Sequence, residues 1–254
     1  MPIDYHVHVV GHGDREHTKK EIIPFLEKAV EVGLKEIGFA DHDFYLANLT
    51  FQHYKDLIEY FPQLKVRVGL EVDYYPDQEN YLGDLLKSYE YDYVIGSVHN
   101  IGDWNFDHPD YIDEYRNWDP EVLYEEYFYI LAKSINSGLF NITGHLDLIK
   151  VFNYRIEAGR LLSMVGPLLD LIKGRGMAVE INTNGLFKPV AELYPSLDII
   201  KLAVEKKVPL TISSDAHRAE DVGRKNSMVV QLLRELGVTW VAGFSGKAMY
   251  QVKI

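Results

Sequence analysis

Histidines and carboxylates recur in this sequence where short apolar runs end. His6 and His8 alternate within DYHVHVV, and Asp215 and His217 have the same spacing at the end of PLTISSDAH. In a β-strand, residues two apart project from the same face, so each pair can bind one ion together. Further apolar runs end in His42, Glu71, His99 and His145. The sequence therefore predicts a metal site on which several strand ends converge.

Two acidic residues lie beside these candidate ligands. Asp41 directly precedes His42, and neighbours in a strand face opposite ways, so His42 is the expected ligand and Asp41 an outer carboxylate that orients one. Asp73 follows Glu71 by two residues, and such an acidic pair repels unless a cation compensates. Glu71 ends the apolar run directly, so it is the expected bridging ligand, with Asp73 solvated or in an outer position.

The types of ligand limit the kind of metal. The sequence has no cysteine, which excludes disulfides, thiolate ligands and cysteine-held iron–sulfur clusters. Histidine with carboxylate suits zinc, manganese or iron and argues against calcium. Since the candidates exceed what one ion takes, we expect two to three divalent ions. Such a cluster lowers the pKa of bound water and neutralises the oxygens of a transferring phosphoryl group.

The elements that position these residues alternate between short apolar runs and longer amphipathic ones. A helix is predicted over Thr18–Val32, with Thr18 as N-cap, Glu21 in a capping box and Gly33 as the stop. The predicted strands are Ile3–Val9, Glu36–Ala40, Val66–Val72, Tyr93–Val98, Phe140–Thr143, Met177–Ile181, Val208–Ser213 and, as a candidate last strand, Val238–Ala242. The other predicted helices are Gln52–Tyr60, Gln78–Tyr89, Glu121–Ser137, Ile156–Lys173, Leu197–Lys206 and Ala219–Glu235.

This alternation predicts an α/β fold of parallel βαβ units in one domain over residues 1–254. A barrel and an open doubly wound sheet both fit. The barrel is favoured because candidate functional residues end nearly every strand, not only those at one switch point. The longest irregular stretch, Asn100–Asp119, carries Trp104, Phe106, His108 and Trp118. We expect it to form a lid or wall over a substrate.

Composition and charge exclude several classes of partner. The net charge is -12, and no stripe of lysine and arginine is present, which argues against nucleic-acid binding. No apolar run approaches the roughly 20 residues of a membrane span. The first residues, MPIDYHVHVV, have no basic region of a signal peptide. The expected protein is cytoplasmic and binds a small molecule.

The order of these motifs resembles the PHP (polymerase and histidinol phosphatase) family along the whole chain. HxH, DH, a glutamate, a lone histidine, GH and SDAH follow one another, and EINTNGLFKPVAELYP is similar to the histidinol phosphatase branch. The resemblance implies a distorted (β/α)7 barrel of TIM-like type with three metal ions at the C-terminal ends of the strands.

The resemblance also implies how the ligands are shared. The first ion would be held by His6, His8, Glu71 and Asp215, the second by His42, His217 and a loop histidine, and the third by His99 and His145 with Glu71 bridging. The loop histidine is His12 from its GHG context, or His17 by counting back from Gly33. His12 is favoured, because His17 lies against the N-cap of the first helix and is expected to be exposed.

The implied reaction is hydrolysis of a phosphate monoester, L-histidinol phosphate to L-histidinol and phosphate, by metal-activated hydroxide, as part of histidine biosynthesis. Glu71, Asp215 and His217 would be the catalytic residues. The branch usually has an arginine where this sequence has Phe187. Lys188, Arg218 and Arg155 are therefore the candidate phosphate-binding residues, although a lysine offers a point charge and not a bidentate fork.

Two alternatives remain from the sequence. The same ions could hydrolyse another phosphoester, or a C–N or lactone bond, and Phe187 with the aromatic Asn100–Asp119 segment motivates this reading. The chain could also be a metal-binding module without turnover. The complete ligand set argues against that second alternative.

Overall fold

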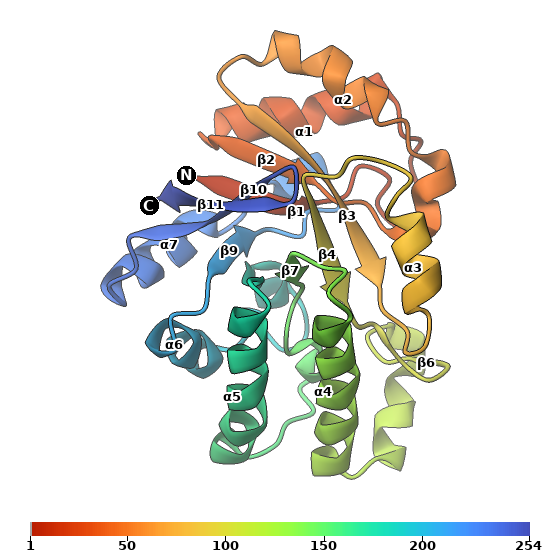
Figure 1. Ribbon diagram of the computed structural model, residues 1–254, viewed down its shortest axis with the longest axis vertical. Coiled ribbons are helices and arrows are strands. Elements are labelled where there is room, and N and C mark those ends of the chain that lie inside the picture. The colour runs from red at the N-terminus through yellow and green to blue at the C-terminus, as the bar shows by residue number, and fades with distance from the viewer. Residues whose placement is uncertain (1) are drawn as a thin grey trace.

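The computed structural model describes residues 2–254 and contains a sheet of seven parallel strands. In sheet order these are β1 (Ile3–Val7), β2 (Glu36–Phe39), β3 (Lys65–Asp73), β4 (Tyr93–Ser97), β7 (Ile142–Thr143), β8 (Ala178–Asn182) and β9 (Leu210–Ser213). Val7 of β1 pairs with Ala216 just beyond β9, and the His8 amide donates to the Ala216 carbonyl at 2.8 Å. The sheet therefore curls into a nearly closed barrel, as the sequence predicts (Figure 1).

Helices lie outside the strands, with α1 and α2 on one side and α4, α5 and α6 on the other (Figure 1). The helices are α1 (Lys19–Glu31), α2 (Gln52–Leu57), α3 (Glu79–Leu85), α4 (Pro120–Ser137), α5 (Ala158–Gly174), α6 (Leu197–Glu205) and α7 (Asn226–Glu235). At the start of α1, the Thr18 side chain accepts from the Glu21 amide, and Gly33 follows its end at φ 74°. Both ends of this helix confirm the prediction.

Short segments follow many of the strands. They comprise the strands β5 (Asn100–Ile101) and β6 (Trp104–Asn105) and the 3₁₀ helices η1 (Asp43–Asn48), η2 (Ile58–Tyr60), η3 (Pro109–Asn117), η4 (Leu148–Lys150), η5 (Asn184–Phe187) and η6 (Ala219–Asp221). The Asn100–Asp119 segment is therefore not irregular. It is a small antiparallel hairpin followed by η3.

Two predicted elements near the C-terminus are wrong. The Val238–Ala242 segment does not close the barrel but contributes to β10 (Trp240–Ser245), which pairs only with antiparallel β11 (Ala248–Lys253). Gly246 and Lys247 both have positive φ, which suits a two-residue hairpin turn. The predicted Ala219–Glu235 helix begins only at Asn226, because positive φ at Gly223 and Lys225 interrupts it.

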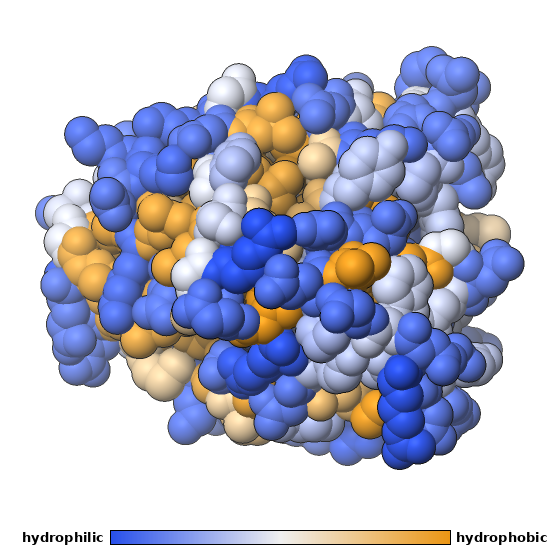
Figure 2. All heavy atoms as spheres, turned by 90° about the horizontal axis from the view of Figure 1, so that it is seen from below, coloured by the Kyte–Doolittle hydropathy of each residue, from blue (hydrophilic) through white to orange (hydrophobic). Residues whose placement is uncertain are grey.

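Apolar side chains form two clusters, a smaller one beneath α1 and α2 and a larger one through the rest of the barrel. Within the larger cluster, Tyr5 meets Tyr93 edge to face with ring centroids 5.0 Å apart. A Cβ at Gly38 would lie 2.2 Å from the Tyr93 hydroxyl, so this position requires glycine. On the face seen in Figure 2, hydrophilic residues surround separate hydrophobic groups. No helix among residues 2–254 is long and apolar enough to span a membrane.

Candidate metal centre

A cavity of about 530 Å³ lies at the C-terminal ends of the strands. Seven of the predicted metal-binding residues line it: His12, His42, Glu71, His99, His145, Asp215 and His217. His6, from β1, and His8, just after it, have ring centroids 4.8 Å apart. The structure thus brings the predicted groups together from β1 and β3 and from the segments after β1, β2, β4, β7 and β9.

Glu71 lies at the middle of this group and is buried. Its two carboxylate oxygens face different histidines. Oε2 lies near His6 Nε2 (3.2 Å), His8 Nε2 (3.6 Å) and His42 Nδ1 (2.9 Å). Oε1 lies near His145 Nε2 (3.1 Å) and His99 Nε2 (3.7 Å). This division is the geometry that a carboxylate bridging two ions requires.

The ligand atoms gather in three overlapping groups, each within 4.8 Å. These are His6, His8 and Glu71; Glu71, His99 and His145; and His8, His42 and His217. Several of their ring nitrogens are buried without a hydrogen-bond partner among the described residues: His6 Nε2, His8 Nδ1 and Nε2, His42 Nδ1, His145 Nδ1 and His217 Nε2. Buried polar atoms are rarely left unpaired, so this donor set fits divalent metal ions.

Asp215 is held in an unusual backbone conformation, at φ 51°. Asn182 and Asn184 each donate a side-chain amide to its Oδ2, at 3.1 Å and 3.2 Å. Its other oxygen, Oδ1, lies 3.3 Å from His8 Nε2. The two amides therefore fix the carboxylate and leave one oxygen directed at the histidines.

Glu180 is a functional candidate that the sequence analysis missed. This buried residue of β8 pairs with His6 Nδ1 at 2.5 Å, and its other oxygen accepts from the His145 amide at 2.6 Å. Such a carboxylate fixes the orientation and tautomer of a metal-binding histidine. The available signal was an acid within the apolar run MAVEIN, where an unpaired charge would be costly.

The two acidic residues beside the ligands have different positions. Asp73 pairs with His99 Nδ1, so it occupies the outer position that was one of its two predicted alternatives. Asp41 instead accepts from the Val10 amide at 2.8 Å, and burial raises its pKa to about 7. It holds the loop after β1 and contacts no histidine ring through a hydrogen bond.

Burial and neighbouring charges shift the pKa values of the residues in this centre in different directions. Burial lowers the pKa of His6, but Glu71, Glu180 and Asp215 outweigh it and hold this pKa well above its ordinary value. Burial holds the pKa of His8 well below its ordinary value. Burial raises the pKa of Glu71, but the charges of His6 and His42 together with hydrogen bonds from His145 and His42 outweigh it, so the Glu71 pKa lies well below its ordinary value. The central carboxylate is therefore an anion that requires positive charge around it.

The loop histidine at the cavity is His12. Its ring stacks on that of His217 with centroids 4.3 Å apart. His17 is buried, not exposed as expected, because its Nε2 pairs with the Tyr54 hydroxyl at 2.8 Å and its Nδ1 accepts from the Thr50 amide. His17 is outside the cavity. His12 lines the cavity but does not belong to the three close groups of ligand atoms.

Of the three predicted phosphate-binding residues, Lys188 alone lines the cavity. Arg155 pairs with Glu192 at 3.0 Å, and the largely exposed Arg218 lies 4.0 Å from Glu220, so the structure does not bring either to the site. At Phe187, the guanidinium of Arg224 lies 3.5 Å from the ring centroid. Arg224, an arginine from a different segment of the chain, therefore lies beside Phe187, the position where the histidinol phosphatase branch usually has an arginine.

The Asn100–Asp119 segment forms one wall of the cavity. Asn105, Asp107, His108 and Pro109 line it, and Phe44 faces it from η1. Most of the aromatic residues in the segment pack elsewhere: Phe106 is fully buried, and Trp104 stacks near Trp118. The predicted wall is confirmed, but the polar residues of this segment face the cavity.

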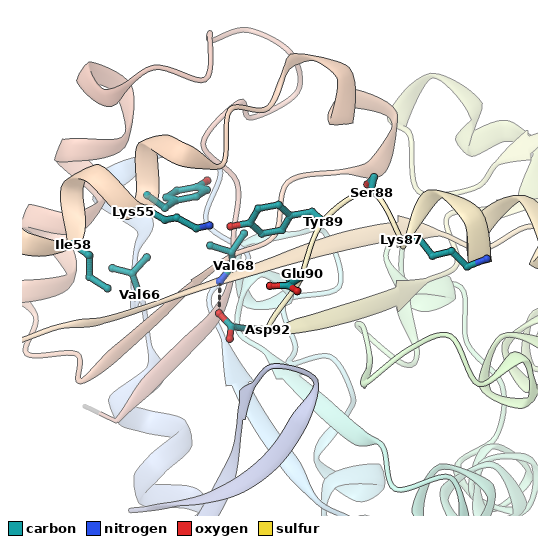
Figure 3. A pocket seen from close by; sticks show the side chains of 10 residues that line it. Lys55, Ile58, Val66, Val68, Lys87, Ser88, Tyr89, Glu90 and Asp92 are labelled. Carbon is teal, nitrogen blue, oxygen red and sulfur yellow. Dashed lines mark hydrogen bonds between the residues drawn. The ribbon is translucent and has the colours of Figure 1, made fainter.

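A second cavity, of about 600 Å³, lies between α2, β3 and residues 87–92 (Figure 3). Some of its polar groups contact the protein itself. Asp92 accepts from the Val68 amide at 3.0 Å, and Lys55 lies over the Tyr89 ring at 5.6 Å. None of the three groups of possible metal ligands found in the described residues belongs to this cavity.

The fold and the site define a class, a (β/α)7 barrel with a candidate metal centre of several ions at the C-terminal strand ends. A family model described as the PHP domain matches residues 4–184, and this chain belongs to that family. The resemblance predicted from the sequence is thereby confirmed.

Individual relatives cover nearly the whole chain. It is 34% identical over 248 residues to a probable histidinol-phosphatase of Deinococcus radiodurans, covering 92% of this chain and 93% of that protein. It is 30% identical over 260 residues to the histidinol-phosphatase of Bacillus subtilis, covering 87% and 95%. A Lactococcus lactis histidinol phosphate phosphatase, solved with zinc, L-histidinol and phosphate, has a similar fold, with a TM-score of 0.84, 24% identity and 98% of each chain covered.

Proposed function

We propose that this protein is a metal-dependent phosphoesterase that hydrolyses L-histidinol phosphate to L-histidinol and phosphate. The observation that carries the proposal is the buried Glu71 carboxylate among histidines, several of whose buried ring nitrogens have no hydrogen-bond partner among the described residues. The names of relatives that match the chain along nearly its full length support the choice of substrate. Strands from both ends of the chain build one cavity, which supports a single domain over residues 1–254.

The proposed metal content is two to three divalent ions of zinc, manganese or iron. The proposed ligands are His6, His8, His12, His42, Glu71, His99, His145, Asp215 and His217. The zinc reported with the Lactococcus lactis protein supports a divalent ion at such a site. When bound, these ions would activate water as a nucleophile and neutralise the phosphate oxygens.

Several residues of this chain would position the metal ligands and the phosphate group in that reaction. Glu180 and Asp73 accept from the Nδ1 atoms of His6 and His99, which leaves each Nε2 lone pair for a metal. His217 suits the role of a ligand, since burial lowers its pKa to about 4 and keeps the ring neutral near pH 7. Lys188 offers a positive charge at the cavity wall for the phosphate group.

The walls of the cavity also suit a small organic phosphate. Phe44 stacks on the His42 ring with centroids 4.7 Å apart, and Leu148, Val151 and Tyr194 add apolar surface. Flat and apolar side chains of this kind suit an imidazole ring and limit water around the reacting bond. Glu71, Asp215 and His217 are the proposed catalytic residues, because they border the space that the phosphate would enter.

The test is phosphate release by purified protein loaded with manganese, zinc or iron. We expect release from L-histidinol phosphate to exceed release from other phosphomonoesters, and no hydrolysis of lactones or amides. Release that is equal across the phosphoesters would overturn the choice of substrate. Turnover of lactones or amides alone, or bound metal without any turnover, would overturn the phosphoesterase itself.

A further inference from the structure

One wall of the cavity offers hydrogen-bond acceptors that no part of the described chain satisfies. Asn105 Oδ1 is buried and has no hydrogen-bond partner among residues 2–254. The half-buried Asp107 makes no hydrogen bond or ion pair within residues 2–254. Both residues line the cavity. Two neighbouring acceptors, one of them charged, suit a hydrogen-bond donor on a ligand.

The backbone fixes these two side chains toward the cavity. Phe106, between them, is fully buried and meets Tyr127 edge to face at 5.5 Å. Its amide donates to the His99 carbonyl at 3.2 Å, next to a candidate ligand. Asn105 ends β6, Phe106 and Asp107 lie in the turn that follows it, and Asn105 and Asp107 both line the cavity. The β5–β6 hairpin and this turn therefore hold the two residues beside the metal centre.

The charges around the cavity decide what this wall binds. The negative charge of Asp107 disfavours a phosphate on this side, whereas Lys188 offers a positive charge elsewhere in the cavity. Asp107 belongs to none of the groups of atoms close enough to share a metal ion among the described residues. An organic ammonium matches this wall, because its positive charge complements Asp107 and it has three N–H donors and no acceptor.

We propose that Asp107, with Asn105, binds the ammonium group of the substrate, so that the site selects phosphate monoesters of amino alcohols. This inference rests on the proposed phosphatase function and assigns it a specificity-determining residue. The ammonium contact holds the far end of the ester while its phosphate lies at the metal centre. Loss of the contact should therefore weaken productive binding of aminated esters alone.

The experiment compares two esters that differ only in the ammonium group. They are L-histidinol phosphate and imidazolylpropanol phosphate, in which hydrogen replaces the ammonium. For the metal-loaded Asp107→Asn variant, we expect kcat/KM to fall about 10- to 100-fold with the first ester, mainly through KM, since a hydrogen bond to a charged group is lost. With the second ester, we expect the variant to match the wild type.

Asp103→Asn is the matched control, because it removes the same charge from an exposed position on the same hairpin and should leave both esters unaffected. Asp107→Glu should retain most of the preference for the aminated ester. An equal fall for both esters in Asp107→Asn, or no fall for either, would overturn the ammonium site.

Calorimetry keeps this inference distinguishable from the proposed function. If the wild type hydrolyses neither ester, the phosphatase proposal fails. Binding of L-histidinol and of imidazolylpropanol to the metal-loaded protein still tests the ammonium site. We expect the wild type to prefer L-histidinol and Asp107→Asn to lose that preference. Equal affinity of the wild type for the two alcohols would overturn the site.

Discussion

Two buried glutamates on neighbouring strands have opposite surroundings. Glu36, at the start of β2, accepts from the Tyr5 hydroxyl at 2.9 Å and from the Tyr250 hydroxyl, and it pairs with Lys65 and Arg67 at 3.2 Å and 3.4 Å. Glu71, near the end of β3, faces histidines, several of whose buried ring nitrogens lack hydrogen-bond partners in the described chain. The protein completes the first set of contacts itself, whereas the second requires metal ions.

This difference separates stability from function at the two ends of the barrel. At the N-terminal end, the hairpin of β10 and β11 brings Tyr250 to Glu36 and supplies hydrogen bonds to its carboxylate. At the C-terminal end, each strand contributes a group that is costly to bury alone. We therefore expect substitutions at the first end to change the free energy of unfolding, and substitutions at the second to change catalysis and metal content.

The largest effect is expected for His8→Ala. Its two ring nitrogens have no hydrogen bond among the described residues, and it belongs to two of the three ligand groups. We expect phosphate release to fall by more than the 10- to 100-fold typical of losing an outer partner of a metal ligand. Metal content by mass spectrometry should fall in parallel.

His53→Ala is the control for this substitution, because His53 is a half-buried histidine of α2 near His17, outside the metal cavity. It should retain both metal and activity. Thermal unfolding in chelator should be similar for His8→Ala and the wild type. Full activity of His8→Ala would show that this end of the barrel does not depend on its histidines.

A smaller loss of activity is expected for Glu180→Gln. This change weakens the hydrogen bond at His6 Nδ1 without removing a ligand, so activity should fall about 10- to 100-fold. Activity titrated against added manganese should require more metal than the wild type does. Glu205→Gln, on the exposed face of α6, is the control. Unchanged metal affinity in Glu180→Gln would contradict its role as a positioning residue.

At the opposite end, Glu36→Gln should lower the free energy of unfolding by about 1–3 kcal/mol, because charged hydrogen bonds are lost in a buried place. Urea unfolding of the chelated proteins measures this difference. The kcat of the metal-loaded variant should match the wild type. Loss of metal in Glu36→Gln with an unchanged free energy of unfolding would contradict the assignment of stability to the N-terminal end of the barrel and of function to the C-terminal end.

The smallest effect concerns the pH dependence of stability. Burial raises the pKa of Glu36, but hydrogen bonds from Tyr250, Tyr5 and Lys65 outweigh it and lower this pKa. The ionised form is favoured in the folded state, so its contribution is complete above the ordinary pKa of 4.5 and is lost as pH falls through the lower folded value. The stability difference between wild type and Glu36→Gln should therefore narrow on acidification. A stability difference that does not change with pH would contradict a lowered pKa of Glu36 in the folded state.

The sequence predicts the barrel and the metal centre because both rest on local patterns. Alternation along a strand places His6 and His8 together, and a parallel sheet brings their neighbours from other strands to the same edge. The outer partners depend on packing between segments far apart in the chain. Glu180 reaches His6 across 174 positions, and the direction of Arg155 is set by Glu192, so neither could be read from spacing alone.

Individual residues also explain why the sequence pattern was misleading in some places. His17 is polar and lies at a helix start, but its partner Tyr54 comes from α2 and buries it. Positive φ at Gly223 and Lys225 breaks an amphipathic period that reads as one helix. The length and the aromatic residues of Asn100–Asp119 did indicate a wall, but most of these aromatic side chains pack elsewhere, and Asn105 and Asp107 line the cavity.

The most direct test of a metal centre around Glu71 is anomalous diffraction from crystals of the protein loaded with zinc or manganese. We predict two to three peaks, with one ion on each side of the Glu71 carboxylate, among the rings of His6, His8, His42, His99 and His145. Peaks only at the protein surface, with these rings bound to one another or to water, would contradict the account.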